Sequence, residues 1–195
     1  ASSEEKEVTK YTYDKNGLLK EQSCSGGILE AYKFVYTRNK AGAVTGIKQY
    51  NADGKVVESI VNTVKNGKVT KQKIYQIDAS SGKKTLYSTS TVTYKNGKLS
   101  KVITKSKDNT TTETYYTNGN PKKVVTKSDS YEYVYNYNKK GHVTSSTSKA
   151  TYGGTTSTAT ATYKTTTNKK GDVTKEVITE TTKTGSNTST ATMTT

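Results

Sequence analysis

Apolar and polar residues alternate along much of this 195-residue chain with a period of two. Because successive side chains of a β-strand point to opposite faces of a sheet, such alternation predicts strands with one apolar or aromatic stripe. No segment has the i, i+3, i+4, i+7 spacing of an amphipathic helix. The stripes fall at Tyr131, Tyr133, Tyr135 and Tyr137, at Ile28, Tyr32, Phe34 and Tyr36, and at Val69, Tyr75 and Ile77.

Glycine-containing turns separate the predicted strands at short intervals. Asn-Gly and Asp-Gly pairs tolerate the positive φ angles that two-residue hairpin turns require. Together with looser reversals, the turns predict about fourteen strands of roughly six to eleven residues. The pairs are Asn16-Gly17, Asp53-Gly54, Asn66-Gly67, Asn96-Gly97 and Asn118-Gly119, and Lys-Gly follows at 140–141 and 170–171.

One phrase, an aromatic residue or Thr followed by Asn, Asp or Lys and then by Gly, recurs down the chain. Its copies lie at 11–21, 39–50, 50–60, 64–74, 94–103, 115–125, 135–146 and 166–178. Short connections place sequence neighbours side by side, so the predicted fold is all-β, an antiparallel up-and-down meander of hairpins. Since wide open sheets curl, split or close, we expect one large twisted sheet curled into a trough or incomplete barrel. We expect a single repeat-built domain over 1–195, with a Thr/Ser/Lys-rich, more weakly packed end from about 145.

The composition limits the core of this protein. Leu, Ile, Val and Phe make up only about 15% of the chain, which is the range of disordered proteins. The 16 tyrosines, the single proline and the strand-forming residues between the turns favour a folded chain instead. The sequence therefore predicts an ordered sheet with a thin core.

The charge balance is strongly basic, with 31 Lys and Arg against 16 Asp and Glu. The lysines are spread evenly along the sequence, so no basic cluster is predicted, and weak attraction to polyanions is expected. Specific nucleic-acid binding is not expected, because Arg38 is the only arginine and no helix is predicted for a groove. The expected partners are an extracellular glycan or an anionic cell-envelope polymer. The sequence gives no oligomeric state and contains no run of apolar residues long enough for a transmembrane helix.

Candidate ligand contacts come from the tyrosine stripes and from neighbouring lysines. Tyrosine rings on one face of a sheet could stack on a sugar, although tyrosine ladders also serve packing. The candidate contacts are Tyr131, Tyr133, Tyr135, Tyr137, Tyr75, Lys71 and Lys73.

No residue pattern predicts a reaction, a cofactor or a metal site. His142 and Cys24 are the only residues of their types, whereas zinc needs three or four such ligands. The Asp-containing turn at 14–17 has turn spacing and lacks the spacing of a calcium loop.

Paired carboxylates do not predict a glycosidase either. Glu176 and Glu180 share a strand face but lie about 13 Å apart, beyond the ~5–9.5 Å of catalytic pairs. A cross-strand pair such as Glu113 with Glu132 stays open. We expect no enzymatic activity.

The copies of the phrase resemble YD repeats of the RHS/teneurin type, which centre on Tyr-x-Tyr-Asp-x-x-Gly-Arg-Leu. Segment 11–19 matches best, with Tyr11, Tyr13, Asp14, Gly17 and Leu18, whereas the Arg after Gly is missing in every copy. The resemblance implies an extracellular β-sheet that wraps or scaffolds without catalytic residues.

The expected function is therefore that of a non-catalytic exported bacterial surface protein with a scaffolding or adhesion role. The alternative is a ligand-binding trough for a glycan, a lipid or a peptide. The expected location is extracellular or at the cell surface, where a lipid anchor on a segment outside this sequence could hold it.

Overall fold

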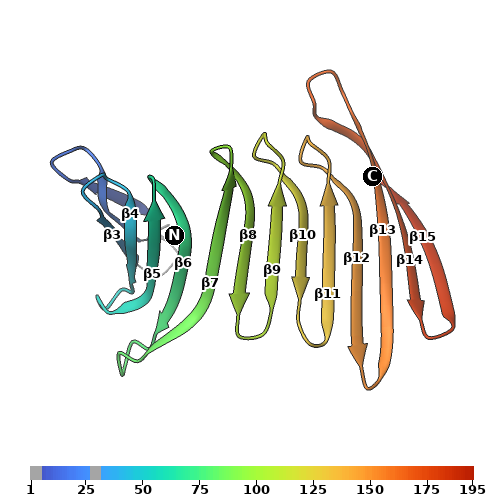
Figure 1. Cartoon of the computed structure of the whole chain (residues 1–195), viewed down its shortest axis with the longest axis horizontal. Helices are drawn as coiled ribbons and strands as arrows, with labels where there is room; N and C mark the ends of the chain where they lie inside the picture. Colours follow the sequence, from blue (N-terminus) through green and yellow to red (C-terminus); the bar gives the residue numbers. More distant parts are fainter. Residues whose placement is uncertain (1–5, 27–31) are drawn as a thin grey trace, which may run out of the picture. The chain divides into compact units, whose positions relative to one another are not determined.

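The computed structural model describes residues 6–26 and 32–195. Within these residues the chain forms fifteen β-strands and no helix, and each strand pairs antiparallel with its sequence neighbours. Figure 1 shows neighbouring strands such as β8 to β12 running alternately up and down. The prediction of an all-β up-and-down meander is confirmed. Among the described strands the ladder does not close on itself, because β1 and β15 stand at opposite ends of the strand order.

The chain divides into two compact units, Ala1–Thr91 and Val92–Thr195, and each is described by itself. The expectation of one domain over 1–195 and the expected trough shape stay predictions. Ile28, which the alternation places in an aromatic stripe, lies outside the described residues. The first unit contains β1 (Val8–Tyr13), β2 (Leu19–Ser25), β3 (Tyr32–Arg38), β4 (Val44–Tyr50), β5 (Val56–Lys65), β6 (Lys68–Ile77) and the larger part of β7 (Lys84–Lys95). The second unit contains the end of β7, then β8 (Lys98–Ser106), β9 (Thr110–Tyr115), β10 (Pro121–Lys127), β11 (Tyr131–Tyr137), β12 (Val143–Tyr152), β13 (Thr155–Thr167), β14 (Val173–Thr184) and β15 (Asn187–Thr194).

An Asn or Asp side chain closes most of the recurring turns. In the turn between β11 and β12, Oδ1 of Asn138 accepts hydrogen bonds from the backbone N–H of Lys140 at 2.9 Å and of His142 at 3.1 Å. Gly141 then takes the left-handed conformation, with φ +91°. The side chains of Asp14, Asn39 and Asn168 make the same pair of bonds in their own turns. In these four copies the repeated phrase thus encodes a side-chain-capped turn.

This turn chemistry corrects the prediction of two-residue hairpins at Asn16-Gly17, Asp53-Gly54 and Asn118-Gly119. Among the described non-glycine residues only Asn66 and Asn96 have positive φ, both +50°. At Asn66-Gly67 the flanking lysines pair directly, as a two-residue turn requires. The other three turns are longer. In each of them the glycine adopts the left-handed conformation and the residue before it does not.

A β-bulge accompanies several of the longer turns and also the two-residue turn at Asn66-Gly67, and a threonine hydroxyl binds a backbone carbonyl at the bulge. In the β11–β12 hairpin the register shifts between Asn136 and Tyr137, which leaves Thr144 as the extra residue. Its hydroxyl donates to the carbonyl oxygen of Asn136 at 3.2 Å. Thr45, Thr70 and Thr174 make the equivalent bond in their hairpins, at 3.3, 3.3 and 3.2 Å. These bonds explain why Val-Thr recurs two residues after the turn glycine.

The core is as thin as the composition predicts. Among the described residues, the buried hydrophobic side chains are Cys24 and Ala161, and no large side chain is fully buried. Both faces of the sheet therefore carry half-buried and exposed residues within each unit. Cross-strand side-chain pairs, rather than a second packed layer, must supply much of the stabilisation.

The strand register sorts side chains in the second unit by chemistry. On strands β8 to β14 one face, called here the lysine face, carries eight lysines and a single carboxylate, Glu132. The opposite face, called the tyrosine face, carries Glu113, Glu176 and Glu180, together with all the tyrosines of these strands. The lysine-face lysines are Lys101, Lys105, Lys123, Lys127, Lys149, Lys164, Lys175 and Lys183. The prediction that no basic cluster forms is therefore wrong, since eight of the ten lysines on these strands share one face although they are spread evenly along the sequence.

Candidate binding face

The four predicted tyrosines of β11 share the tyrosine face. Tyr133 and Tyr135 are 42% and 39% exposed, so their rings are accessible from solvent. Tyr131 and Tyr137 are half-buried. The rings of Tyr131 and Tyr133 lie 5.1 Å apart between centroids, tilted by 46°. This stripe presents aromatic surface without a second layer of the described chain over it.

A hollow of about 180 Å³ lies beside the stripe, over strands β11 to β14. One cross-strand row runs from Tyr135 through Ser146 and Ala161 to Glu180. The next row runs from Tyr133 through Ser148 to Ala159. Because Ser and Ala are small, they leave a low floor between the taller side chains on either side. Ala161, at 5% exposure, is one of the two buried hydrophobic residues among those described.

Tyr163 and Glu180 complete the hollow, and the sequence did not mark either as a ligand contact. The Tyr163 hydroxyl lies 3.3 Å from Oγ of Ser146, which directs the ring from β13 toward β12. The sequence shows Glu180 only as one of two carboxylates on a strand face, and in the structure it lines the hollow while exposed to solvent. The lining contains no lysine, although lysine is abundant in the chain. The signal that could have found this site is the Ser and Ala run between two tyrosine-bearing strands.

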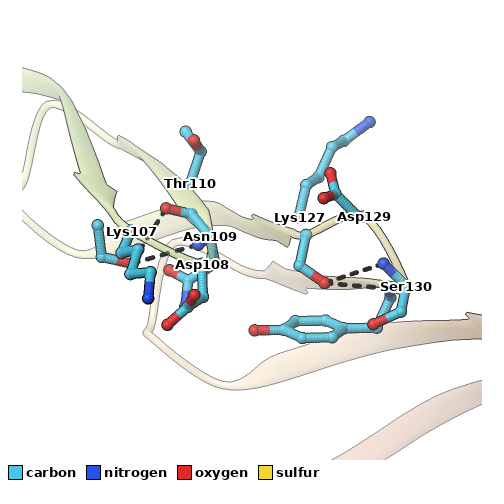
Figure 2. Close-up of a pocket in the computed structure, with 10 residues that line it drawn as sticks. Lys107, Asp108, Asn109, Thr110, Lys127, Asp129 and Ser130 are labelled. Atoms are coloured by element: carbon cyan, nitrogen blue, oxygen red, sulfur yellow. Dashed lines mark hydrogen bonds between the residues drawn. The ribbon is translucent and has the colours of Figure 1, made fainter.

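A second depression, of about 660 Å³, opens between two hairpin turns, at the ends of strands β8 and β10 (Figure 2). Figure 2 shows Lys107, Asp108 and Asn109 on the turn after β8, and Lys127, Asp129 and Ser130 at the turn after β10. Hydroxyls brace both turns, since Oγ of Ser106 accepts from the N–H of Asn109 and Oγ of Ser128 from the N–H of Tyr131, each at 3.2 Å. Two lysines and two aspartates line it, so its charges balance.

Tyr75, Lys71 and Lys73, the other predicted contacts, lie on β6 in the first unit and share one face. The ammonium of Lys84 stands 4.0 Å from the centre of the Tyr75 ring, a cation–π contact. That cation occupies a place where a sugar would stack. The Tyr75 ring is therefore engaged by a cation of the chain itself, whereas Tyr133 and Tyr135 are exposed.

The possible carboxylate pair Glu113 and Glu132 does not form. Glu113 is opposite Val102 and Val124 on the tyrosine face. Glu132 points to the lysine face, where its Oε2 lies 2.8 Å from Nζ of Lys127. Within the described residues no group of three His, Cys, Asp or Glu side chains could hold a metal ion.

Glu113 instead accepts a hydrogen bond from the hydroxyl of Tyr115 at 2.6 Å. Burial, together with this bond and the nearby negative charge, raises the pKa of Tyr115 to about 12. The carboxylate of Asp14 has a structural role in its turn. The hydrogen bond that it accepts from the backbone N–H of Leu18 contributes most to lowering its pKa. That role agrees with the turn interpretation of the 14–17 segment.

The fold defines a class of protein, an antiparallel β-meander of repeated hairpins with solvent access to both faces of the sheet in each unit. No family model matches the chain, and no curated protein matches its sequence. Within the described residues, no helix is long and apolar enough to cross a membrane.

Three solved structures show distant similarity. One is a TcdB2–TccC3 structure without its hypervariable C-terminal region, 15% identical over 94% of this chain and 12% of that one, with a TM-score of 0.36. Another is a porin-like protein from Bacteroides uniformis, 13% identical over 99% of this chain and 91% of that one, with a TM-score of 0.40. A protein of unknown function from Bacteroides fragilis is 8% identical over 76% of this chain and 83% of that one, with a TM-score of 0.24. These likenesses assign neither a family nor an activity.

Proposed function

We propose that the chain is a non-catalytic, exported bacterial surface protein whose tyrosine face holds a saccharide. The hollow bounded by Tyr133, Tyr135, Tyr163 and Glu180 carries this proposal. Saccharides combine apolar C–H faces with many hydroxyls, and binding sites for such ligands combine aromatic walls with a few placed polar groups. The tyrosine rings can contact the apolar C–H face of a sugar. Polar groups for its hydroxyls come from Ser146, Ser148 and the Glu180 carboxylate.

The size and charge of the hollow favour this ligand over the alternatives. At about 180 Å³ it is smaller than the ~300–1,000 Å³ of pockets that enclose a drug-sized molecule, so it suits one sugar ring of a longer glycan. A lipid tail would need a longer apolar channel than this serine-containing floor provides. An anionic ligand would meet the Glu180 carboxylate without a lysine in the lining. We therefore infer an uncharged or amine-bearing sugar.

A scaffold role and kinship with YD repeats belong to the same proposal. The capped turns and the regular meander support them, since both give an extended surface without a deep cleft. The separation of Glu113 and Glu132 onto opposite faces supports the absence of catalysis. The extracellular location agrees with glycans as ligands.

A pair of matched substitutions tests the saccharide site. Ala161 and Ala191 lie opposite Glu180 from either side on the same face, yet Ala161 forms the floor and Ala191 is exposed on β15. Both changes to valine suit a strand. In a glycan-array screen followed by titration calorimetry, we expect Ala161→Val to abolish binding and Ala191→Val to preserve it.

Aromatic stacking is tested by Tyr135→Ala against Tyr152→Ala, since Tyr152 is 74% exposed and does not line the hollow. Binding through the hollow should persist at high salt and be lost with Tyr135→Ala alone. Equal loss in both tyrosine variants, or no binding to any neutral or amine-bearing glycan, contradicts the proposal.

A further inference from the structure

Four lysines form one straight row across the lysine face. Lys105, Lys127, Lys149 and Lys183 belong to β8, β10, β12 and β14, and all four are exposed. The register joins them through the residues between them, Thr110, Glu132 and Thr158. In the sequence they stand 22, 22 and 34 residues apart, so only the strand pairing brings them into line.

The row has a regular spacing. Neighbouring strands lie about 4.8 Å apart, so lysines on every second strand lie about 10 Å apart. This distance is close to the Debye length of about 8 Å at physiological ionic strength, so the lysines repel one another weakly. Within the described residues Lys127 is paired with Glu132, whereas Lys105, Lys149 and Lys183 form no ion pair. Three free lysines therefore belong to one row, which also contains the Lys127–Glu132 ion pair between Lys105 and Lys149.

The surroundings of the row favour an anionic polysaccharide over other polyanions. The tyrosines of β8 to β14 all lie on the opposite face, so no aromatic ring is available beside the row for base stacking. The absence of aromatic anchors on this face of these strands also argues against a lipid interface. Threonine hydroxyls fill the same row at Thr110, Thr158 and Thr188, where they can bind sugar hydroxyls.

We propose that the row formed by Lys105, Lys127, Lys149 and Lys183 binds a linear acidic polysaccharide that runs across the strands. A lysine on every second strand suits a polymer with a carboxylate on every second sugar better than one with a carboxylate on every sugar. The row and the saccharide hollow lie on opposite faces of the second unit. The two sites can therefore fail separately, because Ala161→Val leaves the lysine row unchanged.

The test compares two fourfold variants of the full chain. In one variant the four row lysines are changed to glutamine. In the other, four exposed turn lysines are changed to glutamine, namely Lys139, Lys140, Lys169 and Lys170. Both lower the formal net charge from +15 to +11, so general attraction falls equally. The probe is a hyaluronan oligosaccharide, which has a carboxylate on every second sugar, and far-ultraviolet circular dichroism checks folding.

We expect the row variant to bind the probe about twelve-fold more weakly, from roughly 0.5 kcal/mol for each of the three lysines that form no ion pair within the protein, and the turn variant to change affinity about twofold or less. Equal losses in the two variants would overturn the proposal, because they would mean attraction by net charge alone. Tighter binding to a single-stranded oligonucleotide or to phosphatidylserine vesicles would overturn it as well. If the fourfold variant fails to fold, Lys149→Glu against Lys139→Glu gives the same comparison, and equal affinities contradict the proposal.

Discussion

The side-chain cap of the β11–β12 turn allows a quantitative test of how this sheet is held in register. Asn138→Ala removes both hydrogen bonds that the amide oxygen accepts, at 2.9 and 3.1 Å. Each bond contributes about 0.5–1.5 kcal/mol net, and water can reach the freed N–H groups in this exposed turn. The free energy of opening the hairpin should therefore fall by about 1–2 kcal/mol.

Hydrogen exchange measured by mass spectrometry provides the assay, because it reports local opening in a chain with two compact units. A loss of about 1–2 kcal/mol corresponds to amide exchange about 5- to 30-fold faster in peptides covering 131–152. The β13–β14 hairpin keeps its own cap at Asn168 and serves as the internal control.

Asn138→Asp tests whether the hydrogen-bond acceptor, rather than asparagine itself, stabilises the turn. A carboxylate can accept the same two hydrogen bonds, as that of Asp14 does. We expect this variant to exchange at nearly the wild-type rate. The reasoning is refuted if Asn138→Ala exchanges like the wild type, or if Asn138→Asp is as fast as Asn138→Ala.

Two further predictions concern backbone conformation and titration. Gly46 does not have positive φ, and the nearest atoms to an added Cβ would be 3.6 Å away, so Gly46→Ala should raise the free energy of unfolding by about 0.5 kcal/mol. Gly141 has φ +91°, so Gly141→Ala should lower the free energy of unfolding by about 1 kcal/mol. Urea unfolding midpoints check both, and shifts in the same direction would contradict the argument. Glu113→Gln removes the nearby negative charge and should lower the pKa of Tyr115 from about 12, as followed by NMR, while burial, the largest cause of the raised pKa, remains. Because the folded pKa of Tyr115 lies above the unfolded one, the stability that depends on the protonated hydroxyl is complete below about pH 10 and is lost as the pH rises toward 12. An unchanged pKa in the variant would exclude the negative charge of Glu113 as a cause of the shift.

Local features of this protein were readable from its sequence. The period-two alternation predicted strands, and the turn glycines predicted where they end, because both depend on residues close in the chain. The tyrosine stripe of β11 followed from the same alternation. The exact turn type did not, since Asn16 and Asn66 both precede glycine yet take different conformations. In the first of these turns the Asp14 side chain captures the backbone N–H groups of Asn16 and Leu18.

The sequence by itself determined the all-β meander, the hairpin boundaries and the thin core, because alternation, turn chemistry and composition are properties of neighbouring residues. Only the tertiary structure decided which strand residues meet. Shifting a strand by one residue moves every side chain to the other face, and each bulge makes such a shift locally. Fixed register therefore places Glu180 beside the floor at Ala161, and it aligns lysines 22 or 34 residues apart on one face.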